Sequence, residues 1–143
     1  MNNTFSLEII TFDKSLHYDD VTCIILRTTS GEISLLANHI DKISNIDITP
    51  LTIKFKDKEE HLALSSGVMD FNHKKNTAYL IVDTVEKAED IDLARAKKRK
   101  IEAEELLSNP SSDIDTSKAE RILKMSINRI NVKEEFSKWV ILK

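Results

Sequence analysis

Glycine, cysteine and long apolar runs are scarce in this sequence, and each scarcity excludes a class of site. Two glycines in 143 residues cannot form a glycine-rich loop that cradles phosphates. The single cysteine, Cys23, cannot build a disulfide framework or a thiolate metal cluster within one chain, and its apolar neighbours predict a small buried residue. No apolar run approaches the roughly 20 residues that cross a bilayer, and the first six residues lack the features of a signal peptide. We therefore expect a chain that stays in a reducing compartment.

Patterns typical of catalysis and metal binding are missing as well. The four histidines, at positions 17, 39, 61 and 73, fall on separate segments without the spacing of metal ligands. No nucleophile elbow is present, and the acidic pairs at 19–20 and 59–60 fall in expected turns. We predict no metal, no resident cofactor and no catalytic residue, so that the chain is not an enzyme by itself.

The charged residues are unevenly distributed. The formal net charge is −3, yet residues 1–86 carry 8 Lys and Arg against 13 Asp and Glu, whereas residues 87–143 carry 13 against 11. We expect the C-terminal part to seek an acidic partner. Residues 97–100 form the strongest basic run. Four consecutive helical positions cover about 300° around the axis, so this run indicates a solvated helix surface rather than a nucleic-acid interface.

The first 86 residues alternate in the manner of β-strands. Phe5, Leu7 and Ile9 define one strand with a solvent-exposed face. Residues 21–26 are apolar on both faces, which is typical of a central strand. Gly31 supplies a turn, and the run from Tyr79 to Val82 predicts a last buried strand. Eight or more short strands, with turns every 8 to 12 residues, favour an antiparallel sandwich or barrel over residues 1–86.

Residues 87–143 follow helical spacing and form a second expected domain. Asp90 is the predicted N-cap of a helix over about 90–108, with Asp92 in its first turn. Pro110 ends that helix, and a second helix is expected over about 116–136. The short link predicts an antiparallel hairpin. Its stripes are rich in alanine and bury little area, so we expect the hairpin to be movable. The stripe residues are Leu93, Ala96, Ala103 and Leu107 on the first helix, and Ala119, Leu123, Ile127 and Ile130 on the second.

One set of side chains could hold a ligand if the hairpin closes. Acids able to hold hydroxyls or an amine would then face cations able to hold phosphates. The alternative is ion pairing within and between the helices, and spacing alone leaves both interpretations open. The set comprises Glu86, Asp92, Arg95, Lys118 and Arg129.

Several segments together resemble the epsilon subunit of the rotary F-type ATP synthase. They are Gly31–Ile33, Asn38–His39, Ser65–Met69 and Asp83–Asp92. The resemblance covers essentially the whole chain. It implies an α+β fold, in which an N-terminal antiparallel β-sandwich of about ten strands precedes an antiparallel two-helix hairpin. It also implies partners: the gamma subunit, the c subunits of the rotor ring and the alpha/beta catalytic head.

The resemblance also implies roles for individual residues. Glu32 and His39 fall where the family contacts the rotor ring. The range 92–96 matches a motif with which some members bind ATP, and the set named above would be the ATP site. Met125 stands where ATP-binding members commonly have arginine, so ATP is expected as a weak regulatory ligand. An inhibitory basic face on the second helix would consist of Lys118, Arg121, Lys124 and Arg129.

The function implied is that of a non-catalytic central-stalk subunit, which couples rotation in the head to proton translocation and restrains ATP hydrolysis through its helices. The expected location is the cytoplasmic face of a bacterial membrane, reached only through the complex, although a plastid-encoded member would look similar. Two alternatives remain open: a free-standing ATP-sensing hairpin, and a generic β-sandwich adaptor. No nucleic acid is expected. The apolar end at 136–142 runs past the usual end of the family and has no assigned role.

Overall fold

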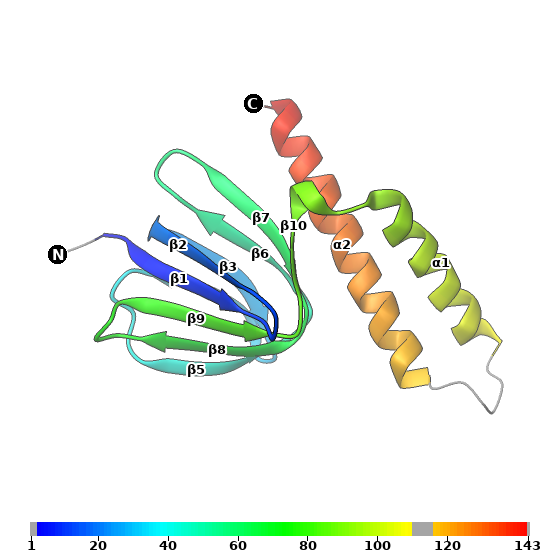
Figure 1. Cartoon of the computed structure of the whole chain (residues 1–143), viewed down its shortest axis with the longest axis horizontal. Coiled ribbons are helices and arrows are strands. Elements are labelled where there is room, and N and C mark those ends of the chain that lie inside the picture. The colour runs from blue at the N-terminus through cyan, green and yellow to red at the C-terminus, as the bar shows by residue number, and fades with distance from the viewer. Residues whose placement is uncertain (1–2, 110–115, 143) are drawn as a thin grey trace. The chain divides into compact units, whose positions relative to one another are not determined.

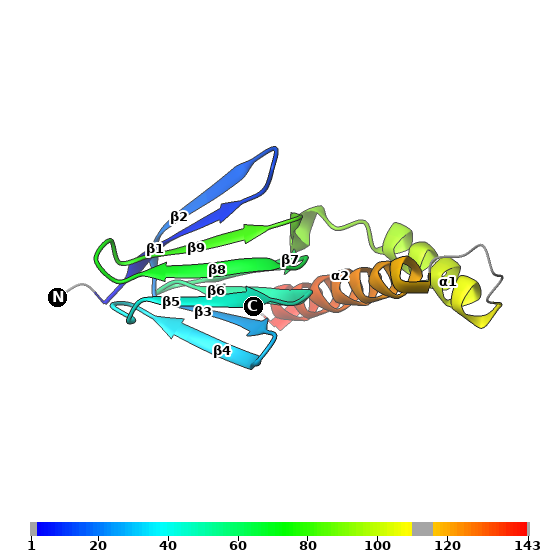
Figure 2. The ribbon, with the colours of Figure 1, turned by 90° about the horizontal axis from the view of Figure 1, so that it is seen from below.

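The chain divides into two compact units, Met1–Lys87 and Ala88–Lys143. The computed structural model describes residues 3–109 and 116–142. Figures 1 and 2 show strands in the first unit and helices in the second.

Ten strands are present in the described part of the first unit. They are β1 (Phe5–Ile10), β2 (Ser15–Val21), β3 (Cys23–Thr28), β4 (Gly31–Leu36), β5 (Lys42–Ile46), β6 (Thr49–Lys54), β7 (Glu59–Leu64), β8 (Gly67–Asn72), β9 (Thr77–Val82) and β10 (Val85–Lys87). Their order along one continuous sheet is β10-β7-β6-β3-β5-β8-β9-β1-β2, and β4 pairs with β3. A single pair, Thr28 with Ile46, joins β3 to β5, and the sheet folds there into two layers. The predicted sandwich is confirmed.

One strand pairing differs from the all-antiparallel expectation. β1 lies parallel to β9, with Leu7 opposite Ala78 and Ile9 opposite Leu80. Alternation of apolar residues reports which face is buried but not the direction of the neighbouring strand. The parallel pair therefore leaves no signal in the sequence.

The core fills the space between the two layers. Side chains from β1, β3, β6, β8 and β9 are fully enclosed, and each aliphatic one contributes roughly 1.5–3 kcal/mol to the stability of the fold. They include Leu7, Ile9, Ile24, Leu51, Ile53, Met69, Phe71 and Leu80, each 0% exposed. Alternate positions on these strands point outward and are available for other contacts.

The sequence pattern does not predict β2. It assigned Val21 to the strand that follows, whereas Val21 ends β2 and the next strand begins at Cys23. The break is at Thr22, two residues after Asp20, which has a positive φ of 59°. β2 is a polar strand at the sheet edge, so it lacks the apolar alternation that marks the others. Cys23 was expected to be buried and is instead half-buried, although burial raises the pKa of its thiol.

The described residues of the second unit form a one-turn 3-10 helix and two α-helices: η1 (Ala88–Asp90), α1 (Leu93–Ser108) and α2 (Thr116–Leu142). Asp92, not Asp90, is the N-cap of α1, because its side chain accepts a hydrogen bond from the Arg95 amide at 3.1 Å. α2 continues to Leu142, beyond the predicted end near 136. Pro110, predicted to separate the helices, lies outside the described residues.

Small side chains form the seam of the hairpin. Ala96, Ala103 and Ala119 are buried, as is Ser126, whose hydroxyl donates to the Ile122 carbonyl at 2.8 Å. Ile127 was predicted to lie in this seam, but it is 37% exposed. The prediction was wrong there because it took steps of four residues, from 119 to 123 and then to 127. A helix turns once every 3.6 residues, so the buried stripe runs through 119, 122–123 and 126, and residue 127 lies to one side of it.

Candidate interaction surface

The outward side of the layer β5-β8-β9-β1-β2 carries exposed aliphatic side chains. Ile43 is 74% exposed, Ile81 51% and Val68 37%. Val68 lies directly opposite Ile81, and Ile81 directly opposite the half-buried Ile10, so these three residues form a row across neighbouring strands. We call Ile10, Ile43, Val68 and Ile81 the outer apolar face. Exposed aliphatic side chains in cross-strand register are typical of a surface that another protein covers.

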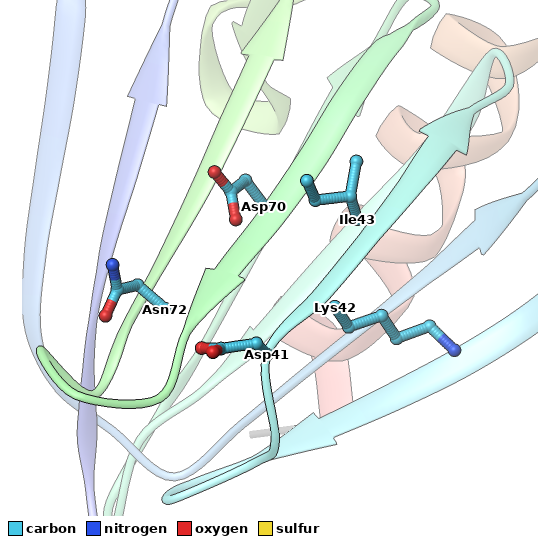
Figure 3. Close-up of a pocket in the computed structure, with 5 residues that line it drawn as sticks. All are labelled: Asp41, Lys42, Ile43, Asp70 and Asn72. Carbon is cyan, nitrogen blue, oxygen red and sulfur yellow. The ribbon is translucent and has the colours of Figure 1, made fainter.

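A pocket of about 470 Å³ lies beside this face. It is lined by Asp41, Lys42, Ile43, Asp70 and Asn72. In Figure 3 the Asp41 carboxylate points toward the strand that bears Asp70 and Asn72, whereas the Lys42 side chain runs to the opposite side. Ile43 lies directly opposite Asp70 in the β5–β8 pair. The pocket therefore places two carboxylates next to an exposed isoleucine, an arrangement suited to a long cationic side chain with an apolar stem.

The Asp41 carboxylate is held in place by the β8–β9 turn. Its Oδ1 accepts a hydrogen bond from the His73 amide at 2.7 Å. The His73 ring nitrogen Nδ1 lies 2.9 Å from the His39 carbonyl oxygen, and the His39 ring meets the Phe71 ring edge-on at 5.6 Å. His39 thus joins the β4–β5 loop to the β8–β9 turn. It is half-buried and performs a structural role in the isolated chain.

A second polar cluster lies at the β1–β2 edge of the same layer. His17 Nδ1 contacts Glu8 Oε1, and His17 Nε2 lies 2.9 Å from Asp19 Oδ1. The Ser6 hydroxyl also donates to Asp19 Oδ1 at 2.9 Å. The hydrogen bond to Glu8, followed by that to Asp19, raises the pKa of His17. The hydrogen bonds from Ser6 and His17 lower the pKa of Asp19.

The two predicted rotor-ring residues lie at opposite ends of β4. Glu32 is exposed at the start of the strand, opposite Arg27, next to Gly31, whose φ of +124° closes the β3–β4 turn. His39 follows the end of β4. At a rise of about 3.3 Å per residue the strand carries the chain roughly 13 Å from Glu32 to Leu36, and His39 lies beyond that end, so the two residues do not form one cluster. Their contact with a rotor ring stays a prediction.

The predicted ATP-site residues are distributed over both units. Glu86 lies on β10, opposite Ala63, in the first unit. Asp92 and Arg95 lie at the start of α1, where Asp92 serves as the helix cap. Figure 1 shows α1 and α2 running antiparallel to each other. Arg95 lies near the start of α1 and Lys118 near the start of α2, so they lie toward opposite ends of the hairpin, whereas Arg129 lies further along α2, toward the end that holds Arg95. Within the second unit, the hairpin therefore does not bring Lys118 to Arg95.

The predicted inhibitory face covers one side of α2. Its four residues, Lys118, Arg121, Lys124 and Arg129, span about 140° around the helix axis. Lys118 and Lys124 are exposed, and Arg121 and Arg129 are half-buried. Met125 is half-buried among them. This face stays a prediction.

Sequence reasoning missed the outer apolar face and Asp70. The signal available was modest. Ile81 falls between two buried positions of β9, and Val68 directly precedes a buried position of β8, where a solvated face would carry polar residues. Ile43 has no buried neighbour in β5 and gives no such signal. Among residues 3–109 and 116–142, no helix is long and apolar enough to cross a lipid bilayer. In that same part of the chain no group of three or more His, Cys, Asp or Glu side chains could hold a metal ion.

Two family models match the chain and together span most of it. Residues 4–88 match the β-sandwich domain of the ATP synthase delta/epsilon chain, and residues 89–134 match the long α-helix domain of the same chain. The ATP synthase epsilon chains of Staphylococcus aureus strains JH9 and Newman are each 35% identical to this chain over 133 residues. The match covers 92% of this chain and 98% of each relative.

Solved structures show the same fold. A chain of the Euglena gracilis mitochondrial ATP synthase (OSCP/F1/c-ring, rotational state 1) superposes with a TM-score of 0.78 at 19% identity, covering 90% of this chain and 80% of that one. A chain of the Tetrahymena thermophila mitochondrial ATP synthase, from its central stalk and c-ring, gives a TM-score of 0.56 at 14% identity, covering 92% and 94%.

Proposed function

Because this chain belongs to the delta/epsilon-chain family of the ATP synthases, we propose that it works as a non-catalytic rotor subunit of the central stalk. In this role it binds the gamma subunit and the c subunits of the rotor ring, and it transmits rotation between the alpha/beta head and proton translocation. It reaches the cytoplasmic face of a bacterial membrane as a peripheral part of the complex.

The outer apolar face carries the proposal. Three aliphatic side chains at least 37% exposed on one layer of a small sandwich cost free energy in water, and burying each one contributes roughly 1.5–3 kcal/mol. The gamma subunit is the partner of this face. The acidic pocket beside it, formed by Asp41 and Asp70, then receives a basic side chain of gamma, which sets the register of the docked surface.

The helices supply regulation. The basic face of α2 would meet acidic segments of the catalytic head and restrain ATP hydrolysis when α2 leaves α1. A seam built on three alanines and a serine buries little area, which supports a hairpin that can open. The rotor-ring contact is assigned to the exposed Glu32 in the β3–β4 turn region, with His39 shaping the loop at the other end of β4.

The test measures how tightly the gamma subunit binds to chains whose outer apolar face has been altered. The variant Ile43→Asp/Ile81→Asp places charges on the outer apolar face, and we expect gamma to bind at least about tenfold more weakly, because two buried aliphatic contacts are lost. Leu36→Asp is the matched control, since Leu36 is a 59% exposed aliphatic residue on β4, outside this face. Equal gamma binding by both variants, with cooperative unfolding retained, would overturn the proposed docking surface. Failure of the unmodified chain to bind gamma at all would overturn the proposed function in favour of a free-standing module.

A further inference from the structure

Lys133 connects the middle of α2 to the first residues of the second unit. Its Nζ donates hydrogen bonds to the Ala88 carbonyl at 3.0 Å and to the Glu89 carbonyl at 3.3 Å. The same ammonium lies 5.6 Å from the centre of the Phe136 ring, one turn along α2. Lys133 is half-buried. One side chain thus spans 45 residues of sequence to reach two consecutive main-chain oxygens.

The acceptors belong to a segment that needs support. η1 has three residues, which is too short to be stable through its own hydrogen bonds. Its internal contact is the Ile91 amide to the Ala88 carbonyl at 3.2 Å, and Lys133 binds that same oxygen. A cation at the carbonyl end of a helical turn also interacts favourably with the aligned peptide dipoles. The exposed carboxylates of Glu89 and Asp90 add negative charge around it.

The buried side chains of the hairpin are mostly small. Ala96, Ala103, Ala119 and Ser126 bury small areas, and Val132 and Asn128 on α2 are the larger buried ones. A hydrogen bond from a charged donor is roughly twice as strong as a neutral one. Lys133 therefore contributes a charge-assisted contact between α2 and the start of the unit.

We propose that Lys133 is a clasp, which holds α2 on η1 and must be released before α2 can leave the hairpin. The Lys133 contact itself does not depend on the proposed regulatory function. Only the effect of its release on ATP hydrolysis rests on that function. Its acceptors are main-chain carbonyls, so the contact survives side-chain changes at 88 and 89. It joins a cation to neutral oxygens, so added salt weakens it less than it weakens contacts between exposed charges.

The experiment compares Lys133→Met with Lys138→Met in the full chain. Methionine keeps an unbranched apolar stem and removes the ammonium. Lys138 is an exposed lysine five residues further along α2, so its variant controls for the loss of one charge. Hydrogen exchange is followed in peptides that cover 88–92 and 116–138. We expect about tenfold faster exchange of both segments in Lys133→Met, the effect of losing one charge-assisted contact, and unchanged exchange in Lys138→Met. Lys133→Arg should recover part of the protection.

Equal exchange in the two methionine variants would overturn the clasp. A second measurement separates the clasp from the proposed function. In the assembled complex, Lys133→Met should lower ATP hydrolysis, because freed α2 reaches the head more often. Faster exchange with unchanged hydrolysis would keep the clasp and overturn the regulatory role of the helices.

Discussion

The Nε2 atom of His17 lies 2.9 Å from Oδ1 of Asp19, two residues along the same edge strand, while Nδ1 meets Glu8 on β1. The imidazole is thus held between two carboxylates on the layer that carries the outer apolar face. Both carboxylates favour the protonated ring, which makes this edge sensitive to pH.

The first prediction concerns this pH dependence. The pKa of His17 is raised above 6.5 and that of Asp19 is lowered below 3.8. The stabilisation from His17 is then fully present below about pH 6.5 and is lost as pH rises through the raised pKa. That from Asp19 is present above about pH 3.8 and is lost as pH falls through the lowered pKa. The difference in unfolding free energy between the native chain and His17→Gln should therefore be largest between these limits.

Proton NMR checks the cause directly. The hydrogen bond to Glu8 is the largest contribution to the raised pKa, so Glu8→Gln should shift the titration midpoint of His17 downward. A midpoint that stays at the same pH in this variant would contradict the assignment.

The second prediction separates the two acidic residues before α1. Asp92→Ala removes the hydrogen bond to the Arg95 amide and should cost about 1 kcal/mol of hairpin stability, the usual effect of losing an N-cap. Asp90→Ala is the control, because Asp90 is exposed in η1 and does not cap α1. The helical signal followed in urea measures both. A larger loss of hairpin stability in Asp90→Ala than in Asp92→Ala would show that Asp90 is the N-cap, as the sequence predicted.

The sequence predicted the sandwich well because its strands are half-buried and alternate strictly, as Phe5, Leu7 and Ile9 do. It failed at β2, where an edge strand has no buried periodicity, and at the β1–β9 pair, whose direction depends on chain topology. The helix start was displaced by two residues because Asp90 and Asp92 are chemically equivalent caps. The extended backbone of Asp92, with ψ of 101°, and the hydrogen bond that its side chain accepts from the Arg95 amide identify it as the cap.

The candidate surface was harder to predict for a different reason. Glu32, Arg95 and Lys118 could be named from the resemblance, but which of them lie close together depends on tertiary packing. The outer apolar face requires the register of four strands, since Val68 and Ile81 become neighbours only through the β8–β9 pair. Lys133 could not be found from spacing, because its partners are main-chain atoms 44 and 45 residues away.

The third prediction concerns the close approach of β8 and β9. A Cβ added at Gly67 would collide with the Ile81 carbonyl oxygen and lie 2.7 Å from the Val82 Cα. Both obstacles are backbone atoms, so Gly67→Ala should destabilise the sandwich by about 1–3 kcal/mol, the range for overpacking. Chemical denaturation of the full chain measures the change. An unaltered midpoint would show that the two strands separate easily at this end.

The fourth prediction tests the basic face of α2. Replacing Lys118, Arg121, Lys124 and Arg129 with glutamine should raise ATP hydrolysis by the assembled complex, because the proposed contacts to the head are electrostatic. The difference from the native complex should shrink as salt is raised, since screening removes the same contacts in the native protein. Lys97→Gln/Lys98→Gln on α1 provides a control for charge removal. The mechanism fails if the α2 variant hydrolyses ATP at the native rate at low salt.

The last prediction concerns ATP. Arg95 and Arg129 lie at one end of the hairpin, and Lys118 lies at the other, so a ligand bound near Arg95 would meet fewer cations than the sequence pattern suggests. Met125 contributes no charge where ATP-binding relatives commonly carry arginine. Losing one charge-assisted hydrogen bond costs about 1.5–3 kcal/mol, or roughly a tenfold to hundredfold loss of affinity. Calorimetry should therefore detect weak binding or none, with a gain in Met125→Arg and a complete loss in Arg95→Ala. Tight ATP binding by the native chain would show that the nucleotide binds at a different site. If Met125→Arg does not raise the ATP affinity, Asp92 acts only as a helix cap and has no role in nucleotide binding.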